Sequence, residues 1–252
     1  MRAYLADLHI HTLLSPCASV EMTPRHIVRR SAQLGINIIA ITDHNACDNV
    51  AAAIEAAEGT GVAVIPGMEV ETREEAHLLT LFETLSQLAV WDAWVRQRRT
   101  GRKNDERRFG AQFVVDAADN LVRVEEAMLL GAIDASVNEV TEAVASIGGM
   151  TIAAHIDRPA YSLLAQLGFI PGDAGLAAVE VSRLTDWTKA WRMPAIGRLP
   201  VITASDAHSM EDLVSGPRTQ FILEQAALCE IRLALAGQRE RRIAAGGMIG
   251  GA

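Results

Sequence analysis

The stretch INIIAITDHN, residues 36–45, joins a run of β-branched apolar residues to a polar ending. Such a run is typical of a strand that is buried on both faces of a parallel sheet. An apolar strand at residues 3–8 and a helix at 23–34 precede it, and a helix at 49–58 and a strand at 62–65 follow it. Strand and helix in regular alternation predict an α/β sheet or barrel.

The same alternation returns in the second half of the chain. The pattern there predicts a helix at residues 137–147, strands at 150–154, 177–181 and 200–204, and an amphipathic helix at 224–236. These elements continue the α/β pattern of the first half, so we expect one fold rather than two.

The middle of the chain interrupts the alternation. Residues 85–135 contain a basic segment, 96–108, and a predicted β-hairpin within 109–124. We interpret 85–135 as an insertion or lid on one domain that covers residues 1–245. The glycine-rich residues 246–252 are predicted to form a flexible tail.

Composition narrows the function classes. The chain has 252 residues, 50% of them hydrophobic, and a net charge of -8. An acidic balance with 4% aromatic residues disfavours contacts with long nucleic acids or anionic membranes. No apolar run reaches the roughly 18 residues of a membrane span, and no signal peptide is evident. With three cysteines, too few for a disulfide framework, the sequence predicts a soluble, reduced, cytoplasmic protein.

Six of the seven histidines lie at or beside a predicted strand end. Taken alone, a His-x-His pair, a capped Thr-Asp-His-Asn turn or a lone histidine is more often a structural feature than a metal site. Together they occur where the loops of α/β barrels gather their active sites, which favours a shared metal centre. The six histidines are His9, His11, His44, His77, His155 and His208.

The ordered motifs resemble the polymerase and histidinol phosphatase (PHP) superfamily. They are His-x-His at His9, Thr-Asp-His ending at His44, Gly-x-Glu ending at Glu69, Ala-His-x-x-Arg-Pro at His155 and Ser-Asp-x-His ending at His208. The resemblance implies a distorted (β/α)7 barrel that binds two or three metal ions at the carboxyl ends of its strands. It implies zinc, iron or manganese as the metal, and it is specific for the fold and the metal site rather than for a substrate.

The resemblance also implies an assignment of ligands. A first metal ion would be held by His9, His11, Glu69 and Asp206. Glu69 would bridge to a second ion held also by His77 and His155, and a third ion would be held by His44 and His208.

The remaining ligand of the third ion departs from the family pattern, because Cys17 occupies the position where relatives carry histidine or aspartate. Two alternatives stay open. Cys17 is a thiolate ligand, which would favour zinc over manganese, or the third site is incomplete. The other two cysteines, Cys47 and Cys229, are interpreted as small buried hydrophobic residues.

Histidines and carboxylates without a nucleophile elbow or a phosphate-binding glycine loop favour metal-assisted hydrolysis. The expected mechanism is attack by a metal-bridging hydroxide on phosphorus, with Glu69 as the bridge and Asp206 or His208 passing a proton to the leaving group. Arg158 and Arg183 are predicted to bind phosphate, although a structural ion pair is an equal alternative for each.

Three functions remain open at this point. The first is a phosphoesterase acting on a small phosphorylated metabolite or nucleotide. The second is an exonuclease or nucleotide phosphatase that trims short RNA or DNA, and the third is a non-catalytic metal-binding regulatory module. Because a purely structural role needs no open multi-metal centre, the ligand set favours the first two.

Overall fold

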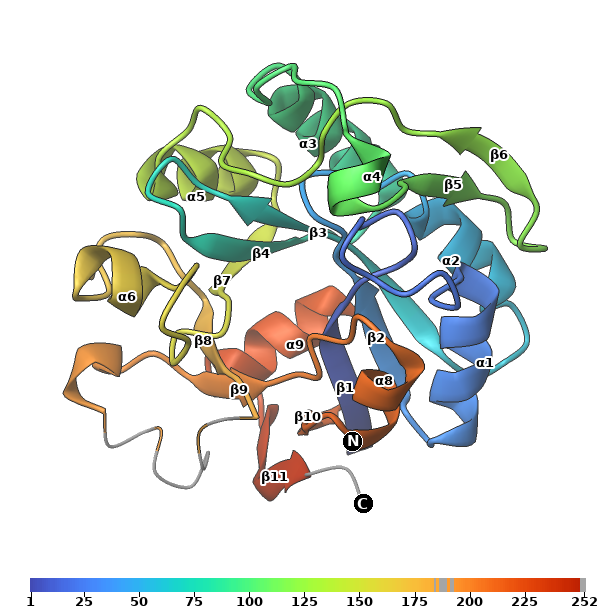
Figure 1. The fold of residues 1–252 in the computed structure, drawn as a ribbon. Coiled ribbons are helices and arrows are strands. Elements are labelled where there is room, and N and C mark those ends of the chain that lie inside the picture. Colours follow the sequence, from blue (N-terminus) through green and yellow to red (C-terminus); the bar gives the residue numbers. More distant parts are fainter. Residues whose placement is uncertain (184, 186–189, 191–192, 250–252) are drawn as a thin grey trace.

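The computed structural model describes residues 1–183, 185, 190 and 193–249, and its centre is a curled sheet surrounded by helices (Figure 1). Nine strands follow the spatial order β11-β10-β1-β2-β3-β4-β7-β8-β9. Their bounds are β1 (Arg2–Ile10), β2 (Ile38–Ile41), β3 (Ala63–Glu71), β4 (His77–Leu81), β7 (Met150–Ala153), β8 (Ala178–Val181), β9 (Val201–Thr203), β10 (Arg218–Leu223) and β11 (Arg242–Ile249).

The helices lie mostly outside this sheet, and a separate hairpin stands apart from it (Figure 1). The helices are α1 (Pro24–Gln33), α2 (Val50–Ala56), α3 (Leu85–Arg96), α4 (Glu106–Phe109), α5 (Val137–Ser146), α6 (Leu163–Leu167), α8 (Met210–Ser215) and α9 (Leu228–Leu235), with a 3-10 turn η1 (Pro194–Ile196). The hairpin consists of β5 (Phe113–Val115) and β6 (Leu121–Val124). No helix in the described part of the chain is long and apolar enough to cross a membrane.

The expected distorted (β/α)7 barrel is confirmed, and its distortion is one reversed strand. Strands β1, β2 and β3 are parallel to one another, as are β7, β8 and β9, but β4 is antiparallel to both of its neighbours, β3 and β7. The link from Glu71 to His77 is too short for a crossover helix, so the chain can only turn back on itself.

Strand β3 is longer than the sequence pattern predicted. It was expected to end at residue 65, yet it continues through Gly67 to Glu71 because β4 pairs with this extension. Gly67 permits the close packing there, since a Cβ atom at this position would lie 2.9 Å from both Leu81 and Thr42.

The barrel closes where β9 and the segment after it approach β10 and β1. Hydrogen bonds to one threonine side chain and one backbone bridge make this contact. The backbone N–H of Thr203 in β9 donates to Oγ1 of Thr219 in β10 (2.9 Å), and that hydroxyl donates to the carbonyl of Thr203 (2.8 Å). At the carboxyl end, Ile10 forms a parallel bridge with Ala207. The first and last strands of the barrel are thereby held side by side.

Strand β2 shows that both faces of the sheet are covered, as its apolar sequence predicted. Ile39 and Ile41 belong to the outer core cluster that also contains Ile27 of α1. Ile38 and Ala40 belong to the inner cluster. This inner cluster includes side chains of α9, which lies across the middle of the barrel in Figure 1 and closes its amino-terminal end.

The insertion is built into the barrel rather than hinged over it. Asn45 donates to the carbonyls of Leu129 and Gly131 (both 2.9 Å), and Asn49 donates to the carbonyl of Phe113 (3.0 Å). The predicted hairpin is present, but residues 109–112 precede it, because Phe109 ends α4.

Two segments near the carboxyl terminus differ from expectation. The last helix begins at Leu228 rather than at residue 224, since Ala227 takes the extended N-cap conformation. The tail expected to be flexible from residue 246 forms the end of β11, where Met248 pairs with Thr219 of β10. Residues 250–252 lie outside the described part of the chain.

A buried carboxyl group in β1 predicts a pH effect on folding. Burial raises the pKa of Asp7 from 3.8 to about 6, and the nearby Arg218 only partly offsets this. The folded protein therefore binds more protons than the unfolded chain between these pH values, so the free energy of unfolding falls as pH rises from about 4 to about 6. The shift corresponds to about 3 kcal/mol.

The expected result is a pH-dependent difference between the wild type and Asp7→Asn. In urea titrations with a chelator present, the variant should gain about 3 kcal/mol relative to the wild type between pH 4 and pH 7. Asp119→Asn, at an exposed turn position, is the control and should follow the wild type. A constant difference between Asp7→Asn and the wild type across this range would contradict the prediction.

Candidate metal centre

The eight core residues of the predicted metal centre come together at the carboxyl ends of the parallel strands. Seven of them lie within or just after β1, β2, β3, β7 and β9, as the sequence predicted. His77 instead begins β4, and because β4 is antiparallel, its start lies at the same rim. The eight residues are His9, His11, His44, Glu69, His77, His155, Asp206 and His208.

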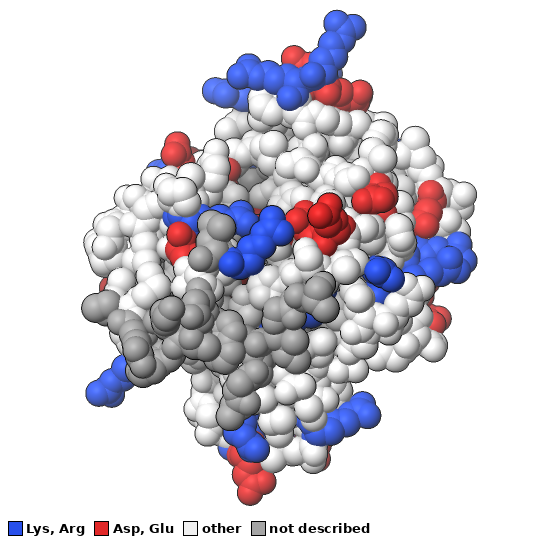
Figure 2. Space-filling view, turned by 60° about the horizontal axis from the view of Figure 1, so that its bottom comes forward, with Lys and Arg blue, Asp and Glu red and all other residues white. Residues whose placement is uncertain are grey.

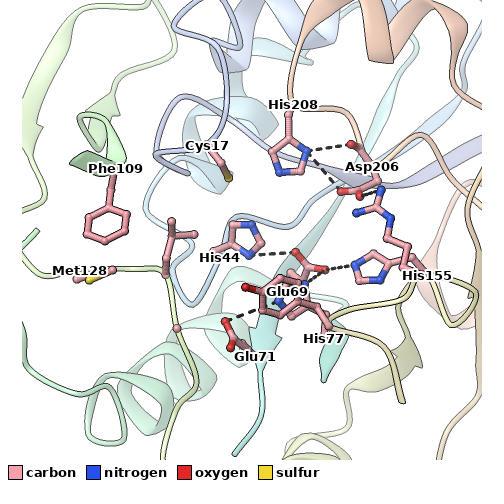
Figure 3. A pocket seen from close by; sticks show the side chains of 14 residues that line it. Cys17, His44, Glu69, Glu71, His77, Phe109, Met128, His155, Asp206 and His208 are labelled. Atoms are coloured by element: carbon pink, nitrogen blue, oxygen red, sulfur yellow. Dashed lines mark hydrogen bonds and ion pairs between the residues drawn. The ribbon is translucent and has the colours of Figure 1, made fainter. Parts of the chain in front are cut away.

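The carboxylate of Glu69 is at the middle of this group, and its side chain is 1% exposed (Figure 3). Five imidazoles surround it. Oε1 lies 3.2 Å from His9 Nε2, 3.0 Å from His77 Nδ1 and 3.3 Å from His155 Nε2, while Oε2 lies 3.3 Å from His11 Nε2 and 3.1 Å from His44 Nδ1.

The outer ring nitrogens of His9 and His11 determine where their protons lie. Nδ1 of His9 faces the carboxylate of Glu180 at 3.1 Å, so it carries the proton and donates. Nδ1 of His11 faces the Ser15 hydroxyl at 3.1 Å, and that hydroxyl donates to Asp43 at 2.7 Å. In the neutral form of each imidazole, Nε2 is therefore the nitrogen without a proton, and it turns a lone pair inward.

These Nε2 atoms converge on one another and on the carboxylates of Glu69 and Asp206, which raise the pKa of both imidazoles against the effect of burial. The Nε2 atoms of His9 and His11 are 3.1 Å apart, and Asp206 Oδ1 lies 3.2 Å and 3.3 Å from them. A set of acceptors that face each other in a buried site is stable when a cation lies between them. The residues present thus fit a metal ion.

Three groups of donor atoms are compact enough to hold metal ions. They are His9–His11–Asp206, His44–Glu69–His77 and His11–His44–His208. The first agrees with three of the four ligands expected for the first metal ion. In the other two, His44 lies between the second and third expected sites, while His155 and Cys17 lie beside these groups rather than within them.

The pKa values in the group show which of its members carry a proton near pH 7. Although burial opposes it, the neighbouring histidines hold the pKa of Glu69 and of Asp206 well below the ordinary range. Burial lowers the pKa of His44 well below its usual value and that of His208 to about 4. Both carboxylates are charged and these two imidazoles are neutral near pH 7, which is the state that binds cations. The carboxylates raise the pKa of His9 and His11, and that of His77 to about 9, against the effect of burial, so a cation would displace protons from these three.

Two of the predicted ligands have left-handed backbone conformations. The φ angles are 27° at His155 and 50° at Asp206, a region that favours glycine. Each follows a short parallel strand, and the turn directs its side chain into the centre of the barrel rim. Such local strain persists where the surrounding structure holds it in place.

A cavity of about 460 Å³ opens beside the centre. On one side it is lined by the predicted ligands, and on the other by Phe109 and Met128 of the insertion (Figure 3). Leu130 also lines the cavity. Tyr161 adds a second aromatic ring, which stacks on His77 with ring centroids 5.0 Å apart. The site is therefore polar at one end and apolar at the other, a combination typical of small-molecule sites.

The two arginines predicted to bind phosphate have different surroundings. Arg158 lines the cavity, and its Nη2 lies 2.5 Å from Asp206 Oδ2. Arg183 is exposed, pairs with Asp212 of α8 at 3.1 Å and is not among the described residues that line the cavity. The structure brings only Arg158 to the candidate site.

Two acidic residues near the centre were not singled out from the sequence. Glu180 in β8 is fully buried and faces His9, and its Oε1 accepts the backbone N–H of His155 at 3.3 Å. Glu71 lines the cavity, with Oε2 3.7 Å from His77 Nε2. The sequence did contain a signal for Glu180, because it is a single carboxylate within an apolar strand. Such a residue in the barrel core must have a polar partner.

Substitution of Cys17 tests the two alternatives left open for the third site. Its thiol lines the cavity but is outside the three compact donor groups, so we expect Cys17→Ala to keep the metal content of the wild type. Metal analysis of both proteins after dialysis checks this, with Cys229→Ala as the exposed control. Loss of one equivalent in Cys17→Ala alone would show that the thiolate is a ligand.

The chain is similar in sequence to known proteins. A family model described as the PHP domain matches residues 7–147. The chain is 29% identical over 137 residues to the 5'-3' exoribonuclease Rnm of Escherichia coli, a match that covers 52% of this chain and 42% of that protein. It is 24% identical over 279 residues to the uncharacterized protein YqxK of Bacillus subtilis, covering 97% of this chain and 65% of that protein.

Among solved structures, the chain resembles the lesion-specific endonuclease PfuEndoQ of Pyrococcus furiosus. The TM-score is 0.76 at 23% identity, with 96% of this chain and 58% of that one covered. The chain thus spans less than two thirds of the length of each of these three proteins. This likeness shows a shared fold.

Proposed function

This chain belongs to the PHP domain family, and we propose that it is a metal-dependent phosphoesterase that acts on a small phosphorylated substrate. The observation that carries the proposal is the convergence of imidazoles and two charged carboxylates beside an open cavity. Such a donor set, with room for a ligand next to it, supports catalysis in addition to metal storage.

The proposed cofactors are two or three divalent ions of zinc, iron or manganese. Imidazole-rich sites with carboxylates suit these metals. The residues of the three compact donor groups would hold them, with Glu69 central and His155 beside it. When bound, the ions would lower the pKa of water to give a nucleophile near neutral pH and would neutralise charge on a phosphoryl group.

The side chains around the centre have separate proposed tasks. Arg158 lies at the cavity end where Asp206 is, so its guanidinium is placed to orient a phosphate. His208 is 27% exposed, and its Nδ1 donates to the backbone carbonyl of Asp206 (3.0 Å). His208 or Asp206 would take a proton from the attacking water and pass it to the leaving oxygen.

A second candidate is cleavage of short oligonucleotides, favoured by the named activities of the relatives. One is called an exoribonuclease and one structure an endonuclease. The apolar wall of Phe109, Met128 and Leu130 also suits a nucleobase better than it suits a sugar. A purely regulatory metal module is disfavoured, because the cavity leaves the centre open to a ligand.

The proposal is tested by metal analysis paired with a substrate screen. Protein purified without added metal should contain two or three equivalents and should release phosphate or nucleotide from some member of a panel of phosphomonoesters and dinucleotides. Bound metal without turnover of any member would favour the regulatory module. Absence of metal even after reconstitution would contradict the proposal.

A further inference from the structure

One aromatic residue at the cavity, Tyr161, has a strained backbone. Its φ angle is 57°, in the left-handed region that bulky side chains rarely adopt. Tyr161 lies in the loop after β7 that also supplies His155 and Arg158 to the cavity, and it is 49% exposed. Backbone strain is retained at functional sites, where the surrounding structure holds it in place. The strain therefore points to a role for Tyr161 in the site.

The residue after Tyr161 explains how the strained conformation is maintained. Ser162 is fully buried and is the N-cap of α6, where its hydroxyl accepts a hydrogen bond from the backbone N–H of Ala165 at 3.1 Å. The same hydroxyl donates to the backbone carbonyl of Arg158 at 2.7 Å. These two hydrogen bonds fix the turn before the helix, so relaxation of Tyr161 would disrupt the cap.

Both the main chain and the ring of Tyr161 contact one candidate metal ligand, His77. The backbone carbonyl of Tyr161 accepts the N–H of His77, the first residue of β4, at 3.0 Å. The phenol ring stacks on the imidazole, with ring centroids 5.0 Å apart and an angle of 29° between the planes. The rings of His44 and His155 also approach this imidazole, but at angles of 65° and 59°, so neither lies parallel to it.

The outer nitrogen of His77 is held less firmly than that of His9. Nδ1 of His9 lies 3.1 Å from the Glu180 carboxylate, and metal-ligating histidines are usually oriented by such a hydrogen bond. In His77, Nδ1 faces Glu69 and the outer nitrogen is Nε2, which lies 3.7 Å from Glu71, beyond the length of a hydrogen bond. A stacked ring can restrict rotation of the imidazole in place of this hydrogen bond.

We propose that Tyr161 is a positioning residue whose ring holds the imidazole of His77 with Nδ1 turned toward Glu69. Without the ring, the imidazole would rotate about its side-chain bonds, and Nδ1 would face the centre for only part of the time. Such a loss of preorganisation lowers the affinity for an ion although every ligand is still present. The inference rests on the proposed metal-dependent function and concerns the ion that His44, Glu69 and His77 would hold.

The test separates the ring of Tyr161 from its backbone. Tyr161→Phe keeps the ring without the hydroxyl, Tyr161→Ala removes the ring, and Tyr161→Gly removes the ring and also relieves the left-handed φ angle. All four side chains are uncharged, so the substitutions leave the charged groups of the surface unchanged. On the face shown in Figure 2 these basic and acidic side chains form separate small groups. A change in zinc affinity would therefore be due to the ring and not to surface charge.

The first measurement is zinc affinity, determined by competition between each metal-free protein and a chromogenic chelator. We expect Tyr161→Phe to bind zinc like the wild type. Tyr161→Ala and Tyr161→Gly should lose about tenfold in affinity for one equivalent of zinc and keep the affinity for the others. Unchanged affinity in both, or an equal loss for every equivalent, would overturn the inference.

The second measurement is the urea midpoint of the metal-free proteins. Because glycine adopts a φ angle of 57° without strain, Tyr161→Gly should have a higher midpoint than Tyr161→Ala. Weaker zinc binding in the more stable of these two variants could not be caused by unfolding. A lower midpoint for Tyr161→Gly would contradict the strain on which the inference depends.

The matched control is Asp119, an exposed residue with a φ angle of 70° in the turn of the β5–β6 hairpin. Asp119→Gly should likewise have a higher urea midpoint than Asp119→Ala. Both control variants should bind zinc like the wild type, because neither changes a ring next to the metal ligands. Weaker zinc binding by either of them would overturn the assignment of the effect to the Tyr161 ring.

The two proposals fail separately. Zinc binding that does not depend on the ring, in a protein that hydrolyses phosphoesters, would overturn only the role of Tyr161. Ring-dependent zinc binding by a protein that hydrolyses no member of the substrate panel would support this role and contradict the proposed phosphoesterase. Absence of zinc binding by the wild type would overturn both.

Discussion

Glu69→Gln should reduce phosphoesterase activity by roughly 1000-fold or more, with loss of bound metal. Both oxygens of Glu69 lie within 3.3 Å of imidazole nitrogens, and the neighbouring histidines keep the carboxylate charged. An amide of the same shape removes the negative charge that balances the cations, and its NH2 group can donate to imidazole lone pairs that would otherwise bind metal.

Glu71→Gln is the matched control for this prediction. Glu71 lies on the same strand two residues further on and lines the cavity. Its carboxylate approaches one of the five imidazoles around Glu69, that of His77, at the longer distance of 3.7 Å. It should keep its metal and most of its activity. Circular dichroism would establish that both variants fold, and metal analysis would report how much metal each retains. A Glu69→Gln protein with more than about a tenth of wild-type turnover would refute the assigned role of Glu69.

Glu180→Gln should lower metal affinity by about 100-fold, although Glu180 contacts the outer nitrogen of His9 and not the nitrogen that would bind metal. The carboxylate of Glu180 accepts the Nδ1 proton of His9 and so keeps the Nε2 lone pair directed inward. A glutamine amide can donate to Nδ1 instead, which favours the tautomer with the proton on Nε2. His9 would then present a proton where a metal ion should bind.

A positioning role for Glu180 predicts rescue by metal. Activity of Glu180→Gln should return toward the wild-type kcat as the metal concentration is raised, while the KM for substrate stays unchanged. Glu71→Gln again serves as the control, because its contact with His77 is longer, 3.7 Å, and its loss should cost less than about tenfold. Activity that stays low at saturating metal would show that Glu180 acts in some other way.

Much of the barrel could be predicted because its strands differ in local pattern from its helices. Residues 38–41 are apolar throughout, and the structure buries them on both faces. The start of α1 could also be predicted from nearby residues, because Thr23 caps the helix by accepting a hydrogen bond from the backbone N–H of His26. The direction of β4 could not be predicted in this way, because an apolar strand has the same sequence pattern whichever way it runs.

In the candidate site, too, some features follow from the local sequence and others depend on contacts between residues far apart in the chain. Ligand types and their order along the chain identify the centre, and the barrel brings His9, Glu69 and Asp206 together at one rim. The role of Glu180 depends on a contact between residues 171 positions apart, which no local pattern encodes. Arg183 had a suitable position in the sequence, but Asp212 binds its guanidinium on the surface.

The contact between the first and last strands of the barrel also has a kinetic meaning. His9 and His11 come from the first strand, while Asp206 and His208 follow the last, so the centre exists only once barrel closure brings the two ends of the sequence together. Contacts of such high sequence separation form late in folding and dominate its rate. A metal ion would therefore bind the closed barrel in preference to partly folded forms. Metal supply would then govern how long the native protein survives proteases in the cell.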